Sequence, residues 1–345
     1  MRAYRLLLIV ATLLALGVIS LGAYVRLSDA GLGCPDWPGC YGQLLGVPEA
    51  AHEQSAAREA FPEHPVQTHK AWKEMLHRYF AGALGLLVAL IAVLAWRYRK
   101  PLRQSPLLPA VLVGVIGLQA LLGMWTVTLR LKPVIVSAHL LGGMSTLALL
   151  VWLLLQSRRS PPPLAFQDDE RQHIAWTRLL AALALLAVVV QIALGGWVSS
   201  NYAALACSDL PTCHGVWQPE MDFAHAFQIQ RDLGLTAKGE LLSLAALTAI
   251  HWSHRIGALI VSILVGALSV TLLRRRQWRN WGWLIAVSLL AQVGLGVANV
   301  LLSLPLSLAV AHNAGAAILL SLTLTLNFRL WQAPIDGQQQ TIRGT

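Results

Sequence analysis

The sequence alternates between long apolar stretches and short polar connections. Eight stretches are long enough to cross the roughly 30 Å hydrocarbon core of a bilayer as helices, and they cover residues 6–25, 79–96, 107–129, 134–155, 179–198, 256–273, 281–302 and 306–330. Hydrophobic residues make up 56% of the 345-residue chain and charged residues only 12%, against about 25% charged residues in soluble domains. The pattern predicts an all-α integral membrane protein with eight transmembrane helices.

The net charge of +10 would suit a nucleic-acid-binding protein, but the basic residues cluster on alternate connections. Arginine and lysine gather within residues 2–5, 97–103, 158–159 and 274–279. By the positive-inside rule these segments are cytoplasmic. We therefore expect both termini in the cytoplasm, a lipid bilayer rather than nucleic acid as the surroundings, and outward-facing connections at residues 26–73 and 199–252. The outward connections carry all four cysteines, in a compartment that permits disulfides.

The second half of the chain repeats the first at a spacing of 173 residues, with one slip of four residues in the outward connections, after which His77 corresponds to His254. Gly22 to Val25 recurs 173 residues later as Gly195 to Val198, and Gln119 recurs at the same spacing as Gln292. This duplication of four-span units predicts two tandem four-helix bundles. Because four is even, a pseudo-two-fold axis along the membrane normal should relate them. The first span can also be read as a cleaved signal peptide, but its counterpart, the fifth span, favours a retained helix.

The duplication also divides the chain into domains. We expect an amino-terminal bundle over residues 1–156, a Pro- and Ser-rich cytoplasmic linker over 157–175, a carboxy-terminal bundle over 176–331 and a polar tail over 332–345. The first outward connection is rich in Ala and Glu over residues 49–61, which favours a short surface helix there.

Four of the eleven histidines stand out because they lie at or just inside the outward ends of even-numbered spans: His77, His139, His254 and His312. An ionisable residue at that depth is functional by default. Gly follows three residues after the second histidine of each half, which would let a flat macrocycle approach the helix. Two histidines from facing helices suit a haem with two axial imidazoles better than a zinc ion. We therefore predict two haem sites, His77 with His139 and His254 with His312.

The two halves differ beside these sites. Glu74 stands three residues before His77, whereas His251 stands three residues before His254. A carboxylate beside one iron and an imidazole beside the other suggest that one pocket performs chemistry and the other stores or passes electrons. A purely structural carboxylate remains the alternative.

An arginine directly follows the first histidine of each half. Arg78 and Arg255 could each pair with a haem propionate, or simply anchor the helix at the membrane interface. The four cysteines form two pairs with five residues between the partners, Cys34 with Cys40 and Cys207 with Cys213. This spacing argues against a thioredoxin-like or zinc-ribbon motif. We expect a disulfide closing each outward loop over its pocket, with a redox-active pair that relays electrons as the alternative.

The sequence resembles the haem A synthase family, of the cysteine-containing bacterial type. The resemblance rests on Gly31-Leu-Gly-Cys34-Pro-Asp-Trp-Pro-Gly-Cys40, on Glu74-x-x-His77-Arg78 and on the duplicated four-span layout with four histidines, and it covers residues 6–330. It implies an oxidoreductase of the bacterial inner membrane, with the cysteine loops in the periplasm. Such an enzyme oxidises a methyl group of haem O to a formyl group, which gives haem A for terminal oxidases.

The resemblance also implies roles for single residues. His77 and His139 would be the axial ligands of the substrate haem O, Glu74 the catalytic acid or base, and His254 and His312 the iron ligands of a haem b cofactor. It further implies a haem O synthase (protohaem farnesyltransferase) and an unidentified redox protein as partners. The oligomeric state, a homo-oligomer included, and the role of His251 are left open.

Two other functions fit parts of the pattern. A bis-haem cytochrome b that only transfers electrons would need the four histidines, but it would not need Glu74 in one half alone. Two haems near the same face also cannot span the bilayer. A transporter that uses the repeat for alternating access would carry broken helices at matching midplane positions, and the sequence shows none.

Overall fold

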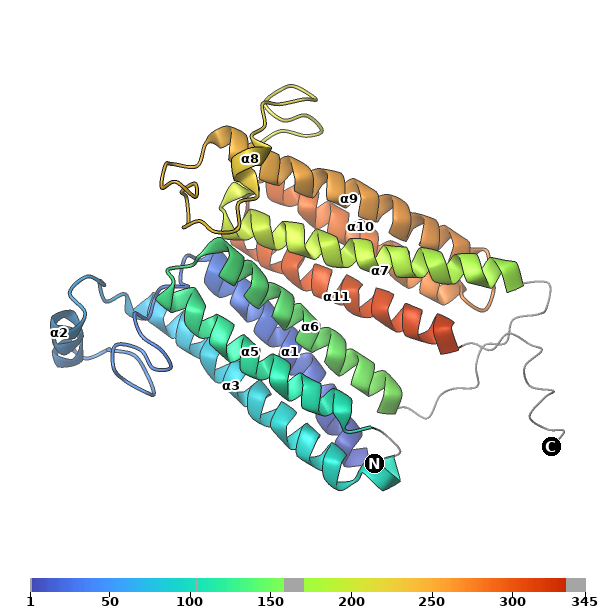
Figure 1. Ribbon diagram of the computed structural model, residues 1–345, viewed down its shortest axis with the longest axis horizontal. Coiled ribbons are helices and arrows are strands. Elements are labelled where there is room, and N and C mark those ends of the chain that lie inside the picture. The colour runs from blue at the N-terminus through green and yellow to red at the C-terminus, as the bar shows by residue number, and fades with distance from the viewer. Residues whose placement is uncertain (1, 103–104, 158–170, 333–345) are drawn as a thin grey trace.

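The computed structural model describes residues 2–102, 105–157 and 171–332, and these residues form a helical protein (Figure 1). Within the described ranges eight helices are long and apolar enough to cross a membrane, namely α1 (Arg2–Leu27), α3 (Thr68–Arg97), α5 (Leu107–Thr128), α6 (Pro133–Ser157), α7 (Arg171–Ser200), α9 (Leu244–Leu273), α10 (Arg279–Leu301) and α11 (Leu306–Gln332). The predicted class, an all-α integral membrane protein, is confirmed. The short helix expected within residues 49–61 is α2 (Ala51–Ala60).

The helices pack in two groups that follow the halves of the sequence. Helices α1, α3, α5 and α6 form one group and α7, α9, α10 and α11 the other (Figure 1). The outward connections, with α2 and the short α8 (Phe223–Ala226), gather at one end of the molecule, the disulfide end. The short connection between α9 and α10 lies at the opposite end (Figure 1).

The two groups meet through α1 with α11, α6 with α7, and α6 with α11. Residues that the repeat makes equivalent also contact one another. The Arg26 Nη2 donates to the Ser199 carbonyl at 2.8 Å, and the Tyr202 hydroxyl donates to Asp29 Oδ1 at 3.2 Å. A two-fold axis between the halves would bring equivalent residues close to the axis into contact with each other in this way. The relation itself stays a prediction that these contacts support.

One hydrophobic core runs through both groups and draws on all eight long helices. Large apolar side chains also point outward along their length, and Leu86 and Leu290 are 76% and 71% exposed. Helices that are apolar on every side are stable only where lipid covers the outer faces. Packing between helices therefore selects the buried face, and the membrane accommodates the rest.

At the disulfide end, two helices begin well before their apolar stretches. The second span was expected from residue 79 and the sixth from residue 256, but α3 begins at Thr68 and α9 at Leu244. The extra turns are stabilised by packing at the disulfide end, where Ala71 and Met75 join a buried cluster with Cys34. As a result, Glu74 lies well inside α3 rather than at its start.

The predicted linker is also shorter than expected. Helix α7 begins at Arg171, so residues 171–175 are helical rather than part of a connection. Residues 158–170 of that linker, and the tail over 333–345, lie outside the described residues. The division into domains otherwise stays a prediction.

Candidate haem sites

His77 on α3 and His139 on α6 face one another across the amino-terminal group. Their ring centroids are 6.4 Å apart and their planes are nearly perpendicular, at 84°. Because a metal–imidazole nitrogen bond is about 2 Å long, this centroid separation is comparable to that of two imidazoles on opposite sides of one metal ion. The structure thus brings together the first histidine pair predicted from the sequence.

His254 on α9 and His312 on α11 form the corresponding pair in the carboxy-terminal group. All four histidines lie in the first part of their helices, at the disulfide end. Both candidate sites are therefore at the same side of the molecule.

A glycine on the neighbouring helix supports each imidazole edge. A Cβ atom built at Gly22 of α1 would lie 2.9 Å from Cε1 of His77, which is too close for the ring to stay in place. The contacts of His254 at Gly195 and His312 at Gly296 are also tight, at 3.1 Å each, whereas His139 lies at an ordinary contact distance of 3.4 Å from Gly123. Glycine at positions 22, 195 and 296 lets the helices approach closely enough to set the rings.

The histidine nitrogens fit a haem ligand set. Nδ1 of His77, His139 and His312 is buried without a hydrogen bond of normal geometry, although backbone carbonyls lie beside the three rings, those of Val18, Gln119 and Gln292. A metal-binding histidine commonly directs one N–H at such a carbonyl and binds the metal through the other nitrogen. Within the described part of the chain, no three His, Cys, Asp or Glu side chains converge as a zinc site would need.

Three glutamines to which the sequence pattern assigned no role also lie at the sites. Gln191 Nε2 donates to the His254 carbonyl at 2.9 Å and lies 3.1 Å from Nδ1 of that ring. Gln292 Nε2 donates to the His312 carbonyl at 3.0 Å. Each glutamine amide lies against a glycine three residues after a histidine, Gln119 at Gly142, Gln191 at Gly257 and Gln292 at Gly315.

This arrangement revises one expectation. Gly142 and Gly315 were expected to leave space for a macrocycle, but glutamine amide groups occupy the space beside them. A sequence signal for the glutamines exists, because Gln stands four residues before the supporting glycine in three of the four helices. Helix α1 departs from that pattern, with Val18 at the corresponding place.

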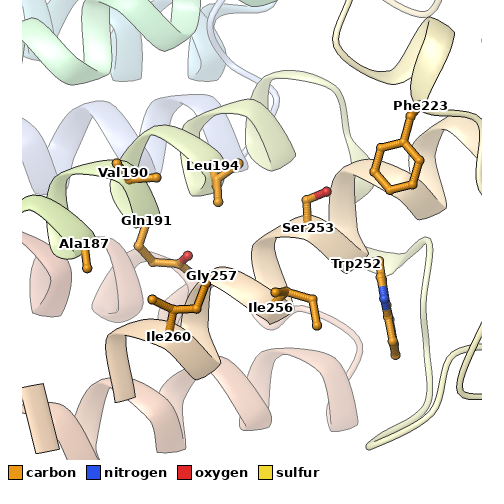
Figure 2. A pocket seen from close by; sticks show the side chains of 10 residues that line it. All are labelled: Ala187, Val190, Gln191, Leu194, Phe223, Trp252, Ser253, Ile256, Gly257 and Ile260. Atoms are coloured by element: carbon orange, nitrogen blue, oxygen red, sulfur yellow. The ribbon is translucent and has the colours of Figure 1, made fainter. Parts of the chain in front are cut away.

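An apolar cavity of about 350 Å³ lies between α7 and α9 beside the second site (Figure 2). Gln191 lines it and reaches toward Gly257. Val190 and Ile260, also in the lining, are 49% and 48% exposed, so the cavity faces the surface that lipid would cover. In the amino-terminal half Phe80 follows His77 at the position that Gly257 holds after His254.

Glu74 is the buried carboxylate of the first site, with 5% of its surface exposed. Its Oε2 accepts a hydrogen bond from the Cys34 backbone N–H at 3.0 Å, and its Oε1 accepts one from Nη2 of Arg78 at 2.5 Å. One helical turn separates Glu74 from His77, so the two side chains share a face of α3.

Arg78 connects α3 to the first cysteine loop. Besides Glu74, it donates through Nη1 to the Asp36 carbonyl at 3.0 Å, to the Pro38 carbonyl at 3.2 Å and to the Gly39 carbonyl. Arg255 is engaged in the same way, with the Thr212 and Cys207 carbonyls each at 2.8 Å. Both arginine side chains thus bind their loops, and their contacts with haem propionates stay predictions.

His251 occupies the place of Glu74 in the second half and is 4% exposed. Its Nδ1 lies 3.3 Å from the Cys207 backbone nitrogen, and its Nε2 lies 3.3 Å from Nε of Arg255. A neutral imidazole accepts through one nitrogen only, so only one of these contacts is a hydrogen bond. The carboxylate of Glu74 satisfies both of its donors.

Both predicted disulfides are present, Cys34–Cys40 and Cys207–Cys213. An aspartate organises each loop, and Asp209 accepts from the Thr212 hydroxyl at 2.6 Å and from the His214 and Gly215 N–H groups at 2.8 and 3.0 Å. The Thr212 hydroxyl, together with the N–H groups, lowers the pKa of Asp209 to about 2. A redox-active role for either cysteine pair stays a prediction.

Comparison with known proteins matches residues 5–324 to the family described as cytochrome oxidase assembly protein. A protein named heme A synthase from Shewanella oneidensis is 45% identical over 325 residues, covering 94% of this chain and 96% of the relative. Proteins of the same name from Halalkalibacterium halodurans and Caulobacter vibrioides are each 27% identical, over 92% and 95% of this chain and 94% and 96% of their own. The chain therefore belongs to the cytochrome oxidase assembly protein family.

Proposed function

We propose that this protein is a haem A synthase, an oxidoreductase that converts a methyl group of haem O to a formyl group and so supplies haem A to terminal oxidases. The names of its relatives support this function. The observation that carries the proposal is the buried carboxylate of Glu74, one turn from a histidine of a facing pair. The carboxy-terminal half has an imidazole in its place.

In this proposal the two halves have different tasks. His77 and His139 bind the iron of the substrate haem O. His254 and His312 hold a haem b cofactor, which supplies one-electron transfer when bound. The supporting glycines orient imidazoles in both halves, and the asymmetry between Glu74 and His251 directs the chemistry to the amino-terminal site.

Glu74 moves the proton in this scheme. Conversion of the methyl group to a formyl group with water as the oxygen donor releases protons and electrons; the electrons leave to the redox partner, and a carboxylate held close to the reacting group can accept a proton. The Cys34 and Gly33 backbone N–H groups and the Arg78 side chain donate to the Glu74 carboxylate, which can accept about four hydrogen bonds, so a lone pair remains to accept a proton. A positioned general base of this kind contributes about 10²–10⁴-fold to a rate.

The proposed setting is a bacterial inner membrane, with both termini in the cytoplasm and the cysteine loops in the periplasm. The basic clusters on alternate connections support this orientation. An enzyme that makes haem O and a separate redox protein complete the proposed partners, because the reaction needs a prenylated haem and a route for electrons.

The test is to express the chain in a bacterial host that makes haem O but no haem A, and to separate the extracted haems by chromatography. Membranes with the protein should contain haem A, and membranes of the host alone should not. Two molecules of haem b per protein without any haem A would instead identify an electron-transfer cytochrome and overturn the proposal.

A further inference from the structure

The Glu74 carboxylate is fixed from two directions. Arg78, one turn further along α3, binds Oε1, and the backbone of the first cysteine loop binds Oε2 through the Cys34 N–H. A glutamate side chain has three rotatable bonds, so two donors from different segments restrict its position strongly. The carboxylate therefore depends on the loop as well as on its own helix.

Arg78 links these two supports. Its Nη2 binds Glu74 while its Nη1 reaches three loop carbonyls, those of Asp36, Pro38 and Gly39. The Cys34–Cys40 disulfide closes the same loop. A planar guanidinium can serve the carboxylate and the carbonyls together, whereas a lysine ammonium on a flexible stem cannot.

Resting on the proposed function, we propose that Arg78 is a positioning residue, which holds the Glu74 carboxylate in its working orientation by fastening it to the cysteine loop. Without the guanidinium, a buried carboxylate loses its counter-charge, and it then takes up a proton or turns away from the site. Either change removes the base from the reacting group while the histidines keep their places.

The second half provides the internal comparison. Arg255 fastens its loop through the Thr212 and Cys207 carbonyls, as Arg78 does in the first half, but its partner on the helix is His251. Holding a loop therefore needs only the arginine and the carbonyls. The additional feature of the first half is the charge-assisted pair between Arg78 and Glu74, whose side chains are 12% and 6% exposed.

The experiment compares Arg78→Gln, Arg78→Lys and Glu74→Gln with the wild type, each as the full-length protein in the host that supplies haem O. Arg130→Gln is the matched control, because Arg130 pairs with Glu63 near the same end at 3.8 Å with both side chains about four-fifths exposed. For every variant the haem A formed, the substrate haem bound and the haem b retained are measured per protein.

Arg78→Gln should lower conversion at least about tenfold, as expected for a displaced catalytic group, with substrate haem and haem b retained. Arg78→Lys keeps the charge at the membrane boundary and should recover part of the conversion. A role in folding alone would instead reduce haem b together with conversion, and it would overturn the proposal. Arg130→Gln should match the wild type.

Two further results separate this inference from the proposed function. Wild-type conversion by Arg78→Gln, while Glu74→Gln is inactive, would overturn the positioning role and leave the proposed function intact. Loss of substrate haem in Arg78→Gln would make the arginine a propionate contact and would also overturn it. Wild-type conversion by Glu74→Gln would reject the catalytic assignment on which the inference rests.

Discussion

Glu74 and His251 meet equivalent partners, an arginine one turn later and the N–H of the first cysteine of a loop. Their chemistry nevertheless differs, because a carboxylate accepts from both partners and a neutral imidazole from one. Of the two equivalent positions, only that of Glu74 therefore offers an acceptor to both donors. This single substitution between repeats supports the placement of the reaction at His77.

Asp209 gives a residue-level prediction about pH. Its pKa is lowered to about 2 from 3.8, so its contribution to stability is present above pH ~4 and is lost as the pH falls toward 2. Asp209→Asn removes an acceptor and should lower the thermal unfolding temperature at pH 7. The difference from the wild type should narrow at pH 3, and an equal difference at both pH values would contradict this account.

The sequence reveals some of these residues and hides others for physical reasons. The four histidines and both disulfides are predictable because the repeat aligns them, and both disulfides are confirmed. The hydrogen bonds of Arg78 to the loop are not predictable, since the acceptors are backbone carbonyls whose direction depends on how the loop folds. The spacing of Gln191 to Gly195 recurs in the sequence, but its partner, the His254 carbonyl on α9, is set by packing between helices and is not predictable.

At the scale of elements, the apolar pattern predicts which residues lie in the hydrocarbon core of the membrane, but not where each helix begins. The eight predicted spans are confirmed, but α3 and α9 extend into the polar region at the disulfide end. Contacts with the cysteine loops stabilise these turns, and such contacts leave no periodicity in the sequence. The catalytic candidate Glu74 lies in one of these hidden extensions.

The glycines of α1 and α7 allow a matched test of helix packing. Gly22→Ala places a Cβ against His77, and Gly195→Ala places one against His254. The first should reduce haem A formation several-fold with haem b retained, and the second should reduce the bound haem b itself. Haem content and conversion per protein measure both effects.

Gly17→Ala is the control, because a Cβ at Gly17 of α1 meets no other group within 4 Å. It should behave like the wild type in both measurements. If Gly22→Ala did the same, the close contact between α1 and the His77 ring would have no part in the site.

At the scale of the whole molecule, both histidine pairs lie at the disulfide end of two groups that contact each other along α1, α6, α7 and α11. Polar contacts join the halves at that end. Lys132 forms an ion pair with Asp232 at 3.3 Å, and the hydroxyls of Ser137 and Ser200 lie within hydrogen-bond distance at 3.0 Å. Haems at the two sites would exchange electrons between the halves rather than across the bilayer. The layout suits a substrate site served by a neighbouring redox site.

The division of tasks predicts separate losses from the two histidine pairs. His254→Ala and His312→Ala should each lose the copurifying haem b, because each removes one of the two imidazoles that would hold its iron. His77→Ala should retain it. The absorption spectrum of the purified protein reports the haem directly, and an unchanged spectrum in His254→Ala would exclude the carboxy-terminal pair as its site.

The central claim is that both halves bind haem and that Glu74 confines the reaction to one of them. The most direct measurement is the haem composition of purified Glu74→Gln from the host that supplies haem O. We predict haem b and haem O in the variant, with no haem A. Haem A at the wild-type level would contradict the claim.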